Sequence, residues 1–485
     1  MNAWNWDPCN NFLGKLILLD IPPELKTNGV RELSISRNDE LQLTLETISP
    51  ASLQEKEEKH PLGTIHTNDK TILLDFHGGQ AILKGVHRTK SSTRFADPLG
   101  TTKNTYNFHS VEYKHSPAER PDFTVDHIAN LPQHYFWPHS SRAIEENTHT
   151  LKFSQIPSLN IRLRNKTDNL QRKCLHLNLG GQEVVIGIQG ESSGLIKNPG
   201  YILYIGDPSD QIRERIRNAL SFTFGAPLIY FGSSAHTQQG NITSTNSCTP
   251  HTVSGNAWRI TPLPPAPITE EGEVSNILSP EYIQHVATGF FSNDHNYNLS
   301  RLPWRLWYAE SAPYFMRPAY YGALIEGIQT AYIESNPSTI SNTITTKPEF
   351  NRSRKILSRY LSSLDLDELQ LKLFTDKLNG ANKAPQRIIS ERFFKNLNLE
   401  LGQLEITAWN KRNDAAHGNE IPQGAEINFI RETKILKIVL NRIILQLTEG
   451  SDFYIDYFTL GHPIRRIESC IGETDAPTDP NQKCK

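Results

Sequence analysis

A short segment, KRNDAAHGNE at residues 411–420, gathers side chains that could carry out acid–base and phosphate chemistry. Arg412 is a permanent cation, His417 titrates near neutral pH, and Asn413 offers an amide. On a helix, Asn413 and His417 would lie on one face, while Arg412 would lie about 140° around from His417. We therefore expect the three side chains to gather at an exposed helix end, with Gly418 closing the helix.

These residue types could serve the cleavage of a phosphodiester, and the family resemblance given below implies RNA, which is cleaved by its own 2′-hydroxyl. That reaction needs a base for the hydroxyl proton, a positive group for the charge that develops on phosphorus, and an acid for the 5′-oxygen. His417 could act as base or acid, Arg412 could hold the phosphate with two hydrogen bonds, and Asn413 could orient the substrate. We expect no metal ion and no cofactor in this chemistry.

Spacing alone is a weak signal for this site. Arg120 with His127, and Arg142 with His149, also satisfy a pattern of Arg, four to six residues, and His. Both of those pairs fall in stretches rich in proline or turn residues, where the sequence predicts no helix to present them. Residues 412–417 stand out because Asn413 follows the arginine and helical patterns flank the motif on both sides.

The motif RNDAAHG resembles the RNxxxH signature of the HEPN superfamily of helical ribonucleases. The flanking helices, ALIEGIQTAY and the long segment ending near Gly450, are similar to the ApeA-like branch found in anti-phage defence proteins. The resemblance implies a homodimer formed through the HEPN bundle, with the Arg and His motifs of two protomers at the interface. It also implies that RNA is cut without metal and that this cleavage acts in abortive infection. It further implies that a β-rich N-terminal domain senses a phage-derived trigger or restrains the nuclease.

Each of these residues also has a plain structural interpretation. Arg412 could be an ordinary solvated charge, Asp414 could pair with His417 one turn later, and His417 could donate to a carbonyl at the helix end. Some HEPN-like bundles bind nucleotides or partners without cleaving anything. A catalytically inactive interaction or nucleotide-binding module is therefore the alternative to a ribonuclease.

Basic residues before and within the motif could contact an RNA backbone. We expect Arg387, Arg392, Lys395 and Lys411 to take this role, because residues 351–400 carry an excess of positive charge. The alternative is a solvated helix face. The chain as a whole has a net charge of −2, so RNA would have to be bound by such a local patch.

The apolar pattern predicts an α+β protein with a β-rich N-terminal domain and an all-α C-terminal bundle. Before residue 300, apolar runs of four to eight residues alternate with turn residues, as in strands. The sequence favours strands at 13–19, 41–48, 71–76, 106–113, 150–156, 174–179, 183–188 and 201–206, and helices at 208–222 and 279–291. After residue 314, spacings of three and four predict helices at 315–335, 354–364, 367–378, 384–397, 401–418 and 427–450.

Composition changes suggest where the domains meet. The segment 262–273 is rich in proline and polar residues, as linkers often are. We therefore expect an N-terminal sensor or regulatory domain at 1–265, a connecting segment with a helix at 266–310, a helical bundle at 311–467 and a frayed tail at 468–485.

Composition and cysteine usage favour a soluble cytoplasmic protein. The 37% hydrophobic and 21% charged residues are typical of globular chains. The five cysteines form no CxxC pair, and a reducing compartment fits them best. The first residues lack the pattern of a signal peptide, and apolar runs are interrupted by charge before they could span a bilayer, so we expect no membrane association.

Overall fold

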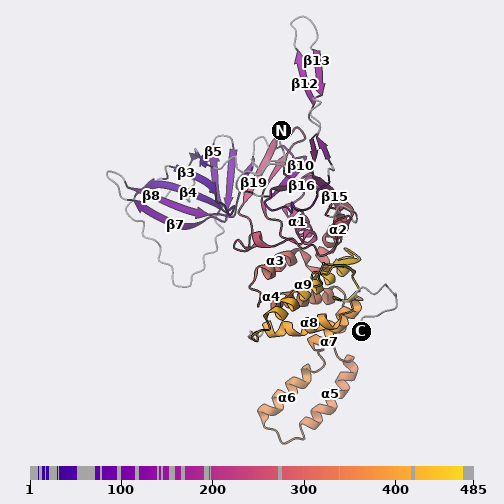
Figure 1. The fold of residues 1–485 in the computed structure, drawn as a ribbon. Helices are drawn as coiled ribbons and strands as arrows, with labels where there is room; N and C mark the ends of the chain where they lie inside the picture. Colours follow the sequence, from indigo (N-terminus) through magenta and orange to yellow (C-terminus); the bar gives the residue numbers. More distant parts are fainter. Residues whose placement is uncertain are drawn as a thin grey trace. The chain divides into compact units, whose positions relative to one another are not determined.

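The structure is a computed structural model of the chain. It describes residues 9, 14–16, 18–20, 30, 32–51, 71–76, 79–94, 100–114, 119–138, 141–143, 146–151, 159–164, 170–189, 196, 198–270, 276–337, 339–416 and 421–472. The chain divides into two compact units, the first formed by 1–264 with 268–291 and the second by 265–267 with 292–485. The division at residues 291 and 292 lies inside the segment that we expect to connect the domains. Figure 1 labels the helices and strands along the chain.

The N-terminal unit is built from two large antiparallel sheets. One sheet has the order β1(Gly14–Leu16), β3(Glu32–Arg37), β4(Leu43–Pro50), β8(Thr101–Asn107) and β7(His87–Arg94). The other has the order β15(Cys174–Leu179), β16(Gln182–Ile188), β17(Gly200–Ile205), β10(Phe123–Ile128), β18(Tyr230–His236), β19(Ile242–Cys248), β9(Ser110–Lys114), β6(Gly79–Lys84), β5(Thr71–Phe76) and β2(Leu18–Asp20). Two small hairpins pair β11(Ser141–Ala143) with β14(Leu170–Arg172) and β12(Glu146–Leu151) with β13(Leu159–Arg164).

Alternating side chains explain how the two sheets pack. Strand β4 alternates buried and half-buried residues along its length, so one face carries Leu43 and Leu45 into the core. These leucines share one apolar cluster with Leu74, Leu83 and Val111 of the larger sheet. Residues 106–113, which the sequence favours as one strand, instead form the end of β8 and most of β9, because the chain changes sheets at Phe108 and His109.

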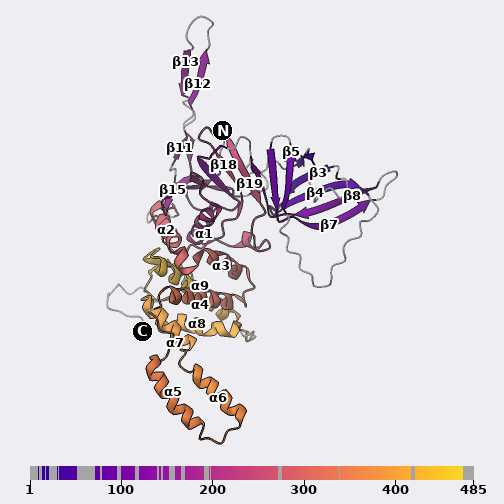
Figure 2. The same ribbon diagram turned by 180° about the vertical axis from the view of Figure 1, so that it is seen from behind.

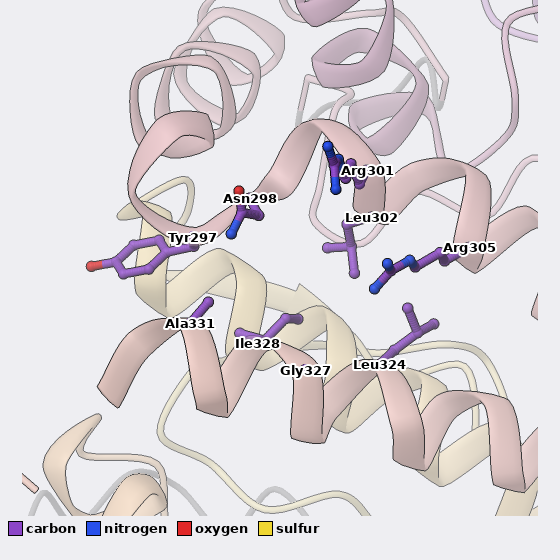
Figure 3. Close-up of a pocket in the computed structure, with 9 residues that line it drawn as sticks. All are labelled: Tyr297, Asn298, Arg301, Leu302, Arg305, Leu324, Gly327, Ile328 and Ala331. Carbon is purple, nitrogen blue, oxygen red and sulfur yellow. The ribbon is translucent and has the colours of Figure 1, made fainter. Parts of the chain in front are cut away.

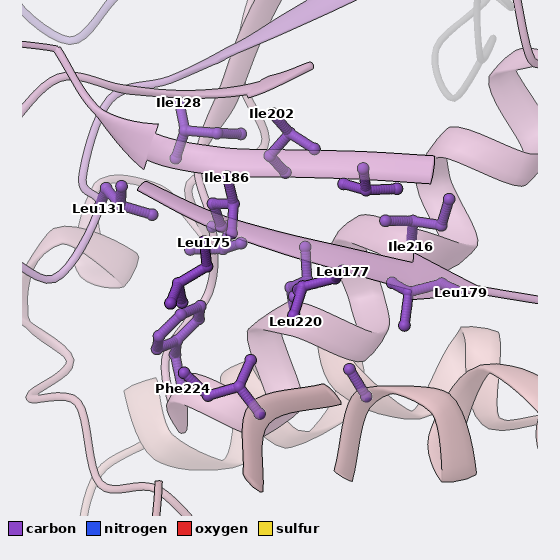
Figure 4. Packing of buried hydrophobic residues seen from close by; sticks show 14 of the residues in the cluster. Ile128, Leu131, Leu175, Leu177, Leu179, Ile186, Ile202, Ile216, Leu220 and Phe224 are labelled. Carbon is purple, nitrogen blue, oxygen red and sulfur yellow. The ribbon is translucent and has the colours of Figure 1, made fainter. Parts of the chain in front are cut away.

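Two helices cover one end of the larger sheet. α1(Asp210–Phe224) begins at Ser209, whose side chain accepts from the Ile212 amide, and ends at Gly225 in the left-handed conformation. Its apolar face, with Ile216 and Leu220, packs in one core with strands β15, β16, β17 and β10 and with the first turns of α2(Pro280–Tyr297) (Figure 4). Burial of this face stabilises the unit by roughly 1.5–3 kcal/mol for each fully enclosed large side chain.

A buried ion cluster also holds α1 on this sheet. The carboxylate of Asp126 on β10 accepts from Arg213 and Arg217 of α1, and the Tyr204 hydroxyl donates to it over 3.0 Å. Asp126 is fully buried, so loss of either arginine would leave a charge without enough partners.

The C-terminal unit is mainly helical. Its elements are η4(Leu299–Arg301), α3(Leu302–Ser311), α4(Arg317–Ser335), α5(Lys347–Leu361), α6(Glu368–Gly380), α7(Gln386–Asn396), α8(Gln403–Ala416), α9(Glu426–Thr448), β20(Phe453–Ile455) and β21(Ile464–Arg466). Helices α4, α8 and α9 pack on one another, and α3 packs on α4 (Figure 2). The helices expected after residue 314 are confirmed, whereas α3 and the β20–β21 pair were not individually predicted.

The two helices α5 and α6 differ from the rest because neither has a buried residue. Apolar side chains remain exposed on both, among them Ile356, Tyr360, Leu369 and Phe374. At the other end of the unit, Cys470 and Ile471 are buried, so packed structure continues past the residue at which we expect the tail to fray, up to residue 472.

Two further observations bear on the expected compartment. Cys9, Cys174 and Cys248 are not disulfide-bonded, whereas Cys470 is. Disulfides persist mainly in oxidising compartments, so Cys470 gives no support to the reducing compartment that we expect. Among the described helices, none combines the length and apolar character that crossing a bilayer requires.

Candidate active site at the end of helix α8

The motif arginine lies in the last turns of helix α8. This helix packs on α4 and α9, and its Ala408 and Trp409 are buried, whereas Leu404 near its start is exposed. Arg412 follows Trp409 by three residues and so lies on nearly the same side of the helix, directed toward α4.

Arg412 is buried, with a relative exposure of 7%, whereas its position at a helix end predicts an exposed side chain. Three contacts explain the difference. Nη1 donates to the carbonyl oxygen of Trp409 over 2.6 Å, and Nη2 donates to Oε1 of Glu326 on α4 over 2.7 Å. The guanidinium carbon also lies 3.5 Å from the ring centroid of Trp409, which is a cation–π contact.

A glycine on α4 makes room for this arrangement. A Cβ added at Gly322 would lie 2.8 Å from Cδ of Arg412, closer than carbon atoms can approach without a shift. Gly322 and Glu326 lie four residues apart and so share one face of α4. This face therefore provides both the space for the arginine stem and the carboxylate for its head.

The Arg412–Glu326 pair is only half enclosed. The Glu326 side chain keeps 41% of its exposure, while the Arg412 side chain keeps 9%. Water can reach the carboxylate, so the ion pair is screened on one side and is easier to exchange than a fully buried pair. The guanidinium can therefore change its partner for another anion without a large desolvation cost for Glu326.

The cavity beside Arg412 is small. Its lining consists of Pro318, Ala408, Lys411, Arg412 and Phe429, together with two further residues of α9. Its volume of about 10 Å³ leaves room for about one water molecule. The described residues thus offer no nucleotide-sized pocket at Arg412. A substrate would reach this group from the open side, next to Glu326.

Of the other members of the expected motif, the structure places only Asn413, and only by its backbone. Asn413 belongs to α8, and nothing is described of its side chain. His417 and Gly418 lie outside the described residues. The structure therefore gives the setting of Arg412 but no geometry between Arg412 and His417.

Three of the four basic residues expected to bind RNA already have protein partners. Lys411 pairs with Glu432 on α9, and Arg387 pairs with Glu391 one turn later on α7. Arg392 donates to the backbone carbonyls of Ser341 and Thr343, and so fastens the segment before α5 to α7.

Lys395 is exposed near the end of α7. The side chain of Arg387 keeps 83% of its exposure despite its ion pair. Arg387 and Lys395 are therefore the two residues of the expected set whose charge is most accessible.

Neither of the two chance matches to the motif lies on a helix, as expected. His127 is on β10, where it is completely buried, and its Nε2 is 3.2 Å from Oγ of Ser234. Burial lowers the pKa of His127 to about 3, so the ring is neutral in the folded protein. Arg142 is on β11 and His149 on β12.

Glu326, Gly322 and Trp409 are the partners of the motif that sequence reasoning misses. The spacing of Gly322 and Glu326 on an apolar helix was the available signal, because a glycine inside a helix usually has a packing reason. In the part of the chain that the structure describes, no cluster of three or more His, Cys, Asp or Glu side chains could hold a metal ion. Comparison with protein-family models, with curated proteins and with solved structures gives no match to this chain.

Proposed function

We propose that this chain is a HEPN-type endoribonuclease of the ApeA-like kind, which cuts RNA by attack of its 2′-hydroxyl and acts in abortive infection against phage. The observation that carries the proposal is the setting of Arg412. It stands five residues before His417 in an RNxxxH motif, and Trp409 and Glu326 fix its guanidinium on the packed helices.

In this proposal each residue has one task. His417 takes the proton of the 2′-hydroxyl or gives a proton to the leaving 5′-oxygen, because imidazole can do either near neutral pH. Arg412 exchanges the Glu326 carboxylate for the scissile phosphate and stabilises the charge that develops on it. Glu326 is a positioning residue, since it holds the guanidinium in place before substrate arrives.

A single chain supplies one His417, whereas the reaction uses both a base and an acid. We therefore propose that a homodimer, formed through the helical unit, brings two motifs together. The β-rich unit would bind a phage-derived trigger or restrain the nuclease. Arg387 and Lys395 would contact the RNA backbone, since their charges are the most accessible of the basic set.

The test is cleavage of RNA by purified full-length protein in the presence of EDTA. The proposal predicts products with 2′,3′-cyclic phosphate ends, and cleavage at least about 100-fold slower by Arg412→Ala and His417→Ala variants that keep the wild-type circular dichroism. Arg259→Ala, at an exposed arginine of the N-terminal unit, is the matched control and should cleave as the wild type does. Cleavage that His417→Ala leaves intact would refute the proposed chemistry.

One observation favours the alternative, an inactive interaction or nucleotide-binding module. Arg412 is buried and already paired, and the cavity beside it is only water-sized. In that case Arg412→Ala would weaken the packing of α8 on α4. Wild-type protein would cut no RNA, even in phage-infected cells. Recovery of one bound partner that depends on the helical unit would then support the interaction module.

A further inference from the structure

A second candidate site lies on the other side of helix α4. An open-sided cavity of about 140 Å³ is lined by the end of α2, by η4 and α3, and by the middle of α4 (Figure 3). Its polar side chains are Tyr297, Asn298, Arg301 and Arg305, and it is completed by apolar residues of α3 and α4. Leu324 and Ile328 line the cavity from positions well around the helix from Gly322, so this cavity is separate from the Arg412 site.

Both arginines of this cavity are exposed, and within the described residues neither Arg301 nor Arg305 has an ion pair or a side-chain hydrogen bond. Arg301 and Arg305 are four positions apart in the sequence, so their charges lie on the same side of one helical segment and repel each other. Figure 3 shows Arg305 extending between Leu302 and Leu324 into the pocket. A bound anion would remove this repulsion.

The glycine in the wall of the cavity is a second, independent observation. Gly327 lies in the middle of α4, where glycine costs a helix about 0.8–1.0 kcal/mol relative to alanine. Gly327 is exposed, and a Cβ added there would meet no atom of the described residues within 4 Å, so no contact in that part of the chain requires a glycine. Gly322, in the same helix, is required by Arg412. The absent side chain at 327 leaves space in the cavity, which suits a ligand that lies against the helix backbone.

The remaining walls define what kind of ligand would fit. Leu302, Leu324 and Ile328 give the cavity an apolar side, and the ring of Tyr297 stacks on Tyr332 with 5.9 Å between ring centroids. Two guanidinium groups prefer an oxyanion that accepts several hydrogen bonds, and phosphate is the best match to their geometry. A ligand with a phosphate at one end and an apolar or planar body at the other would contact both the arginines and the apolar side of the cavity.

We propose that this cavity binds a small organic phosphate, such as a nucleotide, with its phosphate between Arg301 and Arg305 and its body over Gly327. The proposal does not depend on nuclease activity, and its test does not measure cleavage. Because RNA also carries phosphate, inorganic phosphate, nucleoside 5′-monophosphates and a short oligoribonucleotide serve as three separate probes.

Calorimetric titration of the full chain tests the site directly. Wild-type protein should bind at least one nucleoside monophosphate more tightly than inorganic phosphate. Arg301→Ala and Arg305→Ala should each weaken that binding about tenfold or more, since each removes a charge-assisted contact. Gly327→Leu should abolish binding by filling the cavity, while Gly327→Ala, which adds one methyl group, should bind with intermediate affinity.

The controls separate loss of the site from loss of the fold. Gly327→Leu has open space for its Cβ and a better helix propensity, so its melting temperature should equal or exceed that of the wild type. Arg352→Ala should bind as the wild type does. The proposal is overturned if wild-type protein binds neither phosphate nor any nucleoside monophosphate, if only the oligoribonucleotide binds, or if the three cavity variants bind unchanged.

Discussion

Helix α8 carries a glutamate–arginine contact near each of its ends, and the two contacts differ in how far they are closed off from water. Near the first end, Glu405 pairs with Arg442 of α9, and both side chains are at most 1% exposed. Near the other end, Arg412 pairs with Glu326 of α4, and the carboxylate keeps 41% of its exposure. The same two residue types therefore serve in different environments.

Their remaining hydrogen bonds widen the difference. Arg442 also donates to the carbonyl oxygens of Glu400 and Ile467, and its guanidinium lies over the ring of Tyr454. Every direction around it is thus filled by protein. Arg412 donates to a single backbone carbonyl, that of Trp409, besides Glu326. A fully enclosed pair can only hold the fold together, whereas a half-open pair can exchange its carboxylate for a ligand.

The largest effect should come from breaking the enclosed pair. Arg442→Ala leaves Glu405 buried without its counter-charge, and we expect the free energy of unfolding to fall by about 3–5 kcal/mol. Urea unfolding followed by circular dichroism at 222 nm measures this loss. The control is the double variant Arg442→Met with Glu405→Leu, which removes both charges and should recover much of the stability. A single variant as stable as the wild type would mean that the pair is not enclosed.

Removal of the half-open arginine should instead affect activity more than stability. Arg412→Ala should lower RNA cleavage about 100- to 1000-fold, as expected for a group that stabilises transition-state charge. Its stability should fall by only about 1 kcal/mol, because water can solvate Glu326. Arg412→Lys keeps the charge but not the paired donors, so it should restore little activity. A variant with full activity and a large loss of stability would make Arg412 a second structural arginine.

The glycines of α4 offer a matched pair for a smaller effect. Gly322→Ala places a methyl group against Cδ of Arg412 and should shift the guanidinium, so we expect about tenfold slower RNA cleavage with the fold retained. Gly327→Ala makes the same change of residue in the same helix, with nothing within 4 Å to displace. Single-turnover cleavage rates of the two variants measure the difference. Equal rates would contradict the proposed role of Gly322.

The smallest effect concerns a third ion pair, whose carboxylate is more exposed than that of Glu405 and less exposed than that of Glu326. Lys437 of α9 binds Oε1 of Glu310 on α3 over 2.7 Å, with 12% and 13% side-chain exposure, and the Tyr321 hydroxyl donates to the same oxygen. Burial by itself raises the pKa of Glu310, but the charge and hydrogen bond of Lys437 and the hydrogen bond of Tyr321 outweigh it, so the pKa is lower than its ordinary value of 4.5.

A carboxyl whose pKa is lowered by folding contributes stability above its unfolded pKa and loses that contribution as pH falls through its folded pKa. The stability of the wild type should therefore fall as pH decreases below 4.5. Glu310→Gln should be less stable at neutral pH and should show a shallower loss in acid. Thermal unfolding between neutral and acidic pH measures both. Parallel curves for the two proteins would show that Glu310 does not carry this dependence.

The fold was predicted well wherever one face of an element is apolar. Helices α4, α8 and α9 follow from spacings of three and four, and β5 and β15 have the bounds that the pattern predicts. Strands β18 and β19 were missed, because YFGSSAH and ITSTNSC are rich in small polar residues that show little contrast between faces. Their assignment depends on pairing with β10 and β9, which are distant in sequence.

The sequence nominates the residues of the candidate site but does not predict the environment of Arg412. The helix around Arg412 follows from local pattern, but the burial of Arg412 does not. It arises from Glu326, a residue of another helix, and from the space that Gly322 leaves. The basic residues show the same limit, since the partners of Arg392 and Lys411 come from segments that only packing brings close.

RNA cleavage by the full chain in EDTA, compared between wild type, Arg412→Ala and His417→Ala, tests the central claim most directly. The account predicts that wild-type protein produces 2′,3′-cyclic phosphate ends and that each variant, although folded, produces them at least about 100-fold more slowly. Cleavage by either variant at the wild-type rate, or cleavage by the wild type that EDTA abolishes, would contradict it.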